Sequence, residues 1–121
     1  MAYDNLRAAQ GKMLEAVVVN HLQHCSPAQL YMYETPTEEL DCLLIYPDST
    51  CKVIEVKAYA DVQEAIKKSI SLLALEHSYY LRYPCTEKIL VCYATEEHIV
   101  IADNGDSIRV IPADKFLTQL L

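Results

Sequence analysis

Apolar residues recur along the chain at two spacings, and these spacings predict its elements. Between residues 4 and 24 they fall every three or four positions, which is typical of a helix that buries one face. Shorter segments alternate or are almost continuously apolar, which is typical of strands. The predicted elements are a helix over 4–24, strands over 29–34, 39–46 and 51–58, a helix over 61–80, strands over 88–95, 98–103 and 107–111, and a short helix over 112–121.

Residues that start, stop or turn the chain lie between these segments. Pro27 follows the first helix, and Asp61 with Glu64 three positions later has the form of a helix N-terminus. Asn104-Gly105 is a strong signal for a short hairpin, and Pro112 suits the first position of a helix. The order predicts a single mixed α/β domain over 1–121, because no linker or repeat interrupts it.

Composition narrows the class of protein. A chain of 121 residues that is 52% hydrophobic can bury a core, which excludes intrinsic disorder. Its two glycines, Gly11 and Gly105, are too few for a Walker A loop or a dinucleotide-binding fingerprint. We find no signal peptide and no apolar run long enough for a membrane span. Five cysteines without a Cys-x-x-Cys pair indicate thiols in a reducing compartment, so we expect a cytoplasmic location and no membrane partner.

The charge balance argues against a protein that holds nucleic acid by charge alone. Ten Lys and Arg against seventeen Asp and Glu give a net charge of −7, whereas phosphate binding requires clustered basic side chains. The basic residues are scattered, with no run longer than two. Any binding of DNA or RNA is therefore expected to be weak.

Acidic residues are unexpectedly placed on the strands predicted over 39–46 and 51–58. Asp41 shares a strand face with Leu43, and Glu55 shares one with Lys57. In an antiparallel pair these faces coincide only if opposed positions add up to an even number, 96 or 98. A loop over 48–50 or 47–51 gives 98, so we predict an even register and a shared site.

Such a site would be electrostatically unfavourable if all of its carboxyl groups stayed ionised. Two carboxylates about 5 Å apart repel by about 3 kcal/mol at an effective dielectric near 20. Glu39 and Glu15 would add to this repulsion, and Lys57 is the local positive charge that offsets it. The cluster must therefore bind a cation or keep a proton. Oxygen ligands with open positions suit Mg²⁺ or Mn²⁺.

The sequence resembles a known group of nucleases at these residues. Asp41, a short hairpin and then Glu55-Val56-Lys57 match the signature of the PD-(D/E)xK, or restriction-endonuclease-like, superfamily, although Leu40 stands where the signature has proline. Segments 11–22, 30–33, 39–41, 54–57 and 109–117 resemble the nuclease-like C-terminal domain of P-loop ATPases of unknown function. The resemblance implies a core of helix, three strands, helix and strand, here with an added C-terminal hairpin and short helix.

The resemblance also implies roles for individual residues. Asp41 and Glu55 would hold the metal, Mg²⁺ or Mn²⁺, and Glu15 from the first helix would complete or orient its shell. Lys57 would position the attacking water or stabilise charge at phosphorus. Glu15, Asp41, Glu55 and Lys57 are thus the candidate catalytic residues, and the first three are the candidate metal ligands.

Alternative interpretations stay open at this point. A Glu-x-Lys on a strand also occurs on solvated faces, and Glu15 could equally be an exposed helix residue. Three functions follow. The first is a metal-dependent nuclease that hydrolyses phosphodiesters of DNA or RNA, and the second is a catalytically silent nuclease-like module. The silent module would contact an ATPase domain or a second copy of itself. A domain that binds a single cation or has a structural role, without a nucleic-acid role, is a third.

Overall fold

The protein is a mixed α/β domain with one six-stranded sheet, described by a computed structural model for residues 2–34, 39–58, 61–74 and 82–119. The described residues form, in chain order, α1 (Ala2–Cys25), β1 (Gln29–Glu34), β2 (Glu39–Ile45), β3 (Cys51–Val56), α2 (Val62–Ala74), β4 (Cys85–Cys92), β5 (His98–Ile101), β6 (Ser107–Pro112) and α3 (Ala113–Phe116). The predicted order of elements is confirmed, and β1 has the predicted bounds. The end of the predicted second helix, 75–80, lies outside the described residues.

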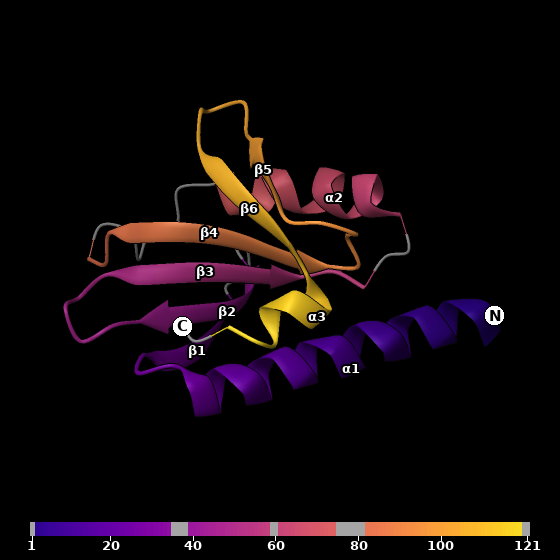
Figure 1. Cartoon of the computed structure of the whole chain (residues 1–121), viewed down its shortest axis with the longest axis horizontal. Helices are drawn as coiled ribbons and strands as arrows, with labels where there is room; N and C mark the ends of the chain where they lie inside the picture. Colours follow the sequence, from indigo (N-terminus) through magenta and orange to yellow (C-terminus); the bar gives the residue numbers. More distant parts are fainter. Residues whose placement is uncertain (1, 35–38, 59–60, 75–81, 120–121) are drawn as a thin grey trace.

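The sheet has the strand order β1-β2-β3-β4-β6-β5 (Figure 1). β1, β2 and β3 form an antiparallel meander, and β5 pairs antiparallel with β6. β4 runs parallel to both β3 and β6. The parallel pairing of β3 with β4 needs a crossover, and α2 lies in the connection between them.

Helices cover both faces of this sheet. On one face Leu14, Val18 and Leu22 of α1, together with Phe116 of α3, pack on the sheet side chains that include Ile54. On the other face α2 contributes two of the residues of a second core, which is made of Leu43, Cys51, Val53, Ala65, Leu73, Leu90, Cys92, Ala102, Ile108 and Val110. The centre of the β2–β3 hairpin is therefore apolar on both faces, as its sequence predicts.

The predicted bounds of β4 are wrong at both ends by three residues. The strand begins at Cys85, where it pairs with Cys51 of β3, although Thr86 and Glu87 give no apolar signal. It ends at Cys92, whose partner Pro112 is the last residue of β6. Backbone pairing with neighbouring strands, and not side-chain hydropathy, decides both ends.

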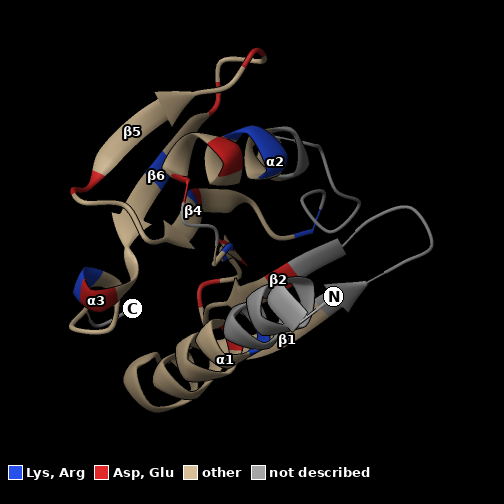
Figure 2. Cartoon of the chain, turned by 90° about the vertical axis from the view of Figure 1, so that its right-hand side faces the viewer, with Lys and Arg blue, Asp and Glu red and all other residues tan. Residues whose placement is uncertain are grey.

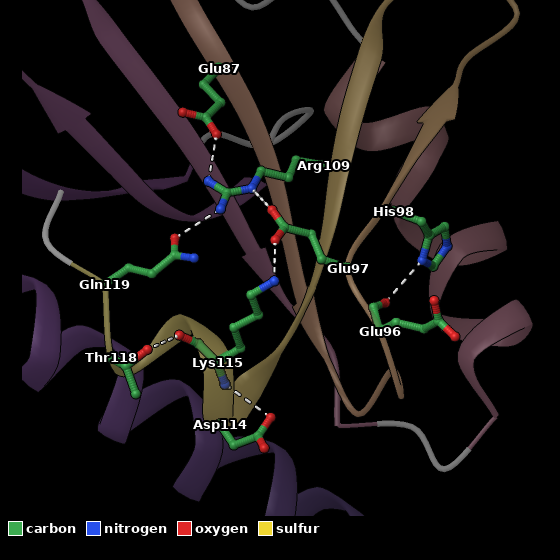
Figure 3. Close-up of polar contacts among 9 residues, drawn as sticks. All are labelled: Glu87, Glu96, Glu97, His98, Arg109, Asp114, Lys115, Thr118 and Gln119. Atoms are coloured by element: carbon green, nitrogen blue, oxygen red, sulfur yellow. Dashed lines mark hydrogen bonds and ion pairs between the residues drawn. The ribbon is translucent and has the colours of Figure 1, made fainter.

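The C-terminal part of the described chain is fastened by a network of charged side chains on the α3 side of the sheet (Figure 3). The Arg109 guanidinium of β6 lies at its centre: Nη1 donates to Glu87 Oε1 over 3.0 Å, Nη2 donates to Gln119 Oε1 over 2.9 Å, and Nε donates to Glu97. Lys115 of α3 binds the other oxygen of Glu97, with 2.7 Å between Nζ and Oε2. One arginine thus joins β4, the β4–β5 connection and the segment after α3.

In the described part of the chain, no helix is long and apolar enough to cross a membrane.

Candidate functional site

The register of the β2–β3 hairpin brings two acidic residues opposite each other. Cys42 pairs with Ile54 and Leu43 with Val53, so the next two positions along the ladder are Asp41 and Glu55. The predicted even register is confirmed. The predicted loops are wrong, because they would have shifted the strands by two positions and placed Asp41 opposite Lys57.

The loop of this hairpin explains the shift. It occupies residues 46–50, between Ile45 and Cys51. The Tyr46 N–H donates to Thr50 O and the Ser49 N–H donates to Tyr46 O, each over 2.9 Å. Ser49 adopts a left-handed conformation with φ of 66°, and the Asp48 carboxylate accepts from the N–H and hydroxyl of Thr50. The polar loop residues thus close a turn one residue earlier than expected.

Asp41 and Glu55 end the ladder by accepting hydrogen bonds from backbone N–H groups of the opposite strand. The Asp41 N–H donates to Glu55 Oε1 over 2.9 Å, and the Val56 N–H donates to Asp41 Oδ2 over 2.8 Å. Regular β2–β3 pairing stops one residue earlier, at Cys42 and Ile54. The two carboxyl groups therefore satisfy backbone donors that the strands leave without strand partners.

Glu55 is a buried carboxyl group, with 1% of its surface exposed. Burial and the negative charge of Asp41 raise its pKa to about 8, and a side-chain hydrogen bond with Asp41 acts in the same direction. The Asp41 N–H and the Lys57 ammonium oppose the rise. At neutral pH the pair therefore holds a proton, which is one of the two ways in which such a cluster relieves its charge.

Lys57 follows β3 directly and joins this pair. Its Nζ lies 3.7 Å from Glu55 Oε2, and its side chain is 30% exposed. Its backbone N–H donates to Val91 O of β4 over 3.0 Å, which fixes the residue after the strand has ended. Asp41, Glu55 and Lys57 thus form one cluster that runs from a buried carboxyl to a partly exposed ammonium group.

Glu15 approaches the cluster from the other face of the sheet. It is half-buried on α1, next to Leu14, which packs in the core on the α1 side. Burial, together with the negative charges of Asp41, Glu15 and Glu55, raises the pKa of the Cys42 thiol to about 12. All three carboxylates therefore lie around Cys42. The role of Glu15 as a metal ligand stays a prediction.

The cluster has some, but not all, of the features of a site for a divalent cation. Within the described ranges, no group of three or more His, Cys, Asp or Glu side chains is arranged to hold a metal ion. Asp41 Oδ2 and Glu55 Oε1 each accept from a backbone N–H, and Glu55 Oε2 lies 3.7 Å from Lys57 Nζ. Mg²⁺ binds through one or two carboxylates and keeps several waters, so two such ligands can suffice. The side chain of Glu39 lies outside the described residues.

Most of the basic side chains that the structure describes are already neutralised. Ion pairs engage at least five of the ten Lys and Arg residues, namely Lys52, Lys57, Lys88, Arg109 and Lys115. Figure 2 shows basic and acidic segments side by side on α2 and again on α3. This interspersed pattern differs from the basic stripe that nucleic-acid binding favours.

The sequence did not predict the backbone N–H groups that belong to the site. The N–H groups of Asp41 and Val56 hold the two carboxyl groups in place, and no residue pattern specifies them. The signal that could have identified them is the even register itself, since it places two acceptor side chains at the end of a ladder. The partners of Arg109 were missed too, because they come from segments that are separate in the chain.

The fold and the site define a class of protein: a mixed α/β domain with a carboxyl pair and a lysine at the end of its central hairpin. Its family is shown by the sequence, since residues 10–116 match the family described as a domain of unknown function (DUF4143). The chain belongs to this family. Comparison with curated proteins gave no significant match, and comparison with solved structures gave none either.

Proposed function

We propose that this domain is a metal-dependent nuclease-like module of the restriction-endonuclease-like class, acting on phosphodiester bonds of DNA or RNA. The observation that carries the proposal is the cluster of Asp41, Glu55 and Lys57. The two carboxyl groups face each other across the hairpin, and Lys57 Nζ lies 3.7 Å from Glu55 Oε2. The order helix, three strands, helix, strand supports the same class, because it matches the core that the motif implies.

Each residue of the cluster would have its own role in the reaction. Asp41 and Glu55 would hold Mg²⁺ or Mn²⁺, which when bound lowers the pKa of a coordinated water and offsets charge on the phosphate. The backbone N–H groups of Asp41 and Val56 keep the two carboxyl groups oriented. The Lys57 side chain is 30% exposed, so its ammonium group would contact the phosphate and stabilise the charge that develops there.

A second candidate is a catalytically silent module that keeps this fold to contact an ATPase domain or a second copy of the chain. Two observations favour it. Asp41 and Glu55 are already bound to backbone donors and share a proton at neutral pH. At least five basic side chains are engaged in ion pairs, which reduces the charge available to a nucleic acid.

Calorimetric titration with Mn²⁺ at pH 8.5 is the first part of the test, because it measures whether the cluster binds a cation. Under the first candidate function, the wild-type chain binds one cation. Glu55→Gln, which keeps the side-chain shape and removes its charge, weakens binding at least about tenfold, since each lost charged ligand costs more than about 1.4 kcal/mol. Glu96→Gln is the matched control, because Glu96 is exposed before β5, and it should bind as the wild type does.

Cleavage assays with Mn²⁺ complete the test, on duplex, single-stranded and branched substrates. Cleavage that disappears in Glu55→Gln and in Lys57→Met supports the nuclease. Cation binding without cleavage of any substrate supports the silent module. Absence of cation binding in the wild-type chain overturns the metal-dependent proposal.

A further inference from the structure

Two cysteine thiols lie side by side at the start of β3 and β4, at the other end of β3 from Glu55. Cys51 and Cys85 are the first residues of their strands and are partners in the parallel ladder. Neighbouring strands are about 4.8 Å apart, which is within the range of Cα separations that a disulfide spans. Both side chains belong to the core on the α2 side, and they share a hydrogen bond.

Further hydrogen bonds fix the pair in place. The Cys51 thiol donates to Tyr83 O over 3.0 Å, and the Cys85 thiol lies 3.4 Å from Glu87 O. The Cys51 N–H donates to Pro84 O over 2.9 Å. The ladder is irregular immediately after this pair, since Lys52 pairs with Glu87 and not with Thr86. Both sulfur atoms thus contact backbone carbonyl groups in β4 or just before it.

The two thiols differ in access. Cys51 is completely buried, whereas Cys85 is half-buried and lines an open cavity of about 220 Å³. Lys88 and Asp106 line the same cavity and form an ion pair there. Cys85 is therefore the thiol-bearing residue that a small molecule in this cavity meets first, since Cys51 is completely buried.

We propose that Cys51 and Cys85 form a dithiol–disulfide pair that small-molecule disulfides, such as oxidised glutathione, oxidise through the cavity at Cys85. The Cys85 thiolate attacks one sulfur of the disulfide, forms a mixed disulfide and releases the first thiolate. The Cys51 thiolate then attacks the Cys85 sulfur and releases the second. Two protein protons and two electrons pass to the oxidant, which leaves as two thiols.

The order of these steps follows from the surroundings of Cys51. A hydrogen bond with Cys85, burial and the charge of a Cys85 thiolate raise the pKa of the Cys51 thiol, and Lys88 lowers it. Once Cys85 is in the mixed disulfide, it carries neither a thiol proton nor a charge. Burial then remains the main cause that raises the pKa of Cys51, and Lys88 opposes it. Cys51 therefore acts second, as the resolving thiol.

The test uses the whole reduced chain, incubated with oxidised glutathione without denaturant and analysed by mass spectrometry. We expect a product two hydrogen atoms lighter, in which a single disulfide joins the Cys51 and Cys85 peptides. Cys51→Ser should stop at one glutathione adduct on Cys85. Cys25→Ser is the control, since Cys25 lies at the end of α1, and should oxidise as the wild type does.

Thermal unfolding gives a second measurement that does not depend on a variant. The disulfide closes a loop from residue 51 to residue 85, so the oxidised wild-type chain should melt at least about 5 °C above the reduced chain. A glutathione adduct that persists on Cys85 in the wild-type chain overturns the proposal. So does a disulfide that joins any other two cysteines.

Discussion

At the scale of single residues, the most unusual group is the carboxyl of Glu55. A buried acid costs free energy when it is ionised, and a second acid opposite increases that cost. The structure lowers the cost in two ways, since the Asp41 N–H binds one oxygen of Glu55 and a proton is retained near neutral pH. Glu55 is therefore both the best candidate ligand and a source of pH-dependent stability.

The free energy of unfolding should fall as pH rises from 5 to 9 in the absence of metal. The pKa of Glu55 is about 8 in the folded chain, so between its ordinary value of 4.5 and 8 the folded state holds a proton that the unfolded state has lost. The stabilisation is complete below pH 4.5 and is lost through pH 8, by on the order of 5 kcal/mol for a shift from 4.5 to about 8 at about 1.4 kcal/mol per pKa unit.

Urea unfolding at several pH values measures this slope. Glu55→Gln should flatten it, because an amide cannot ionise, whereas Glu96→Gln should keep it. The pKa values of Asp48, Glu97 and Asp106 are lowered by hydrogen bonds to Thr50, Lys115 and Lys88, so they titrate below this range. An equal slope in Glu55→Gln would show that another group causes the change.

At the scale of elements, the β2–β3 hairpin determines whether the candidate site forms, because its register brings Asp41 and Glu55 together. The register depends on a turn that places Ser49 at φ of 66°. Among the described residues other than glycine, Ser49 alone has a positive φ. A side chain in this conformation costs about 1–2 kcal/mol, which glycine avoids.

Ser49→Gly should therefore stabilise the protein, by about 0.5 kcal/mol after the larger entropy of glycine in the unfolded chain is subtracted. Urea unfolding at constant pH measures the change. Ser107→Gly is the matched control, since Ser107 lies in β6 and glycine should destabilise a strand there by about 1 kcal/mol. Equal destabilisation by both substitutions would contradict the turn geometry.

At the scale of the whole molecule, Arg109 connects parts that the sheet does not join. Its guanidinium binds Glu87, Glu97 and Gln119 at once, and 23% of its side chain is exposed (Figure 3). The planar group has several donors in fixed directions, which a single ammonium group cannot reproduce. The segment after α3 is therefore joined to the sheet through the hydrogen bond from Arg109 to Gln119.

Arg109→Met should lower the free energy of unfolding by about 2 kcal/mol, because it leaves two half-buried carboxylates without this partner. Arg109→Lys should recover less than half of the loss. Lys115→Met should cost less than about 1 kcal/mol, since 52% of the Lys115 side chain is exposed. Urea unfolding compares the three variants, and full recovery by Arg109→Lys would contradict the proposed geometry.

Much of the fold could be predicted from the residue pattern, because each element buries side chains at its own period. The helical spacing after residue 4 and the alternation over 29–34 are local properties, and α1 and β1 follow them. The apolar centre of the hairpin likewise predicts a strand covered on both faces, as Val53 and Ile54 show. The strand start at Cys85 could not be predicted, because backbone pairing with β3 sets it.

For the candidate site, the sequence by itself determined the chemistry: two acids and a lysine on strands that share a hairpin, with enough charge to require a cation or a proton. Only the tertiary structure decided their arrangement. A turn at Ser49 set the register, the backbone N–H groups of Asp41 and Val56 fixed the carboxyl groups, and burial raised the pKa of Glu55. Register and burial depend on contacts between distant segments, which a local pattern does not contain.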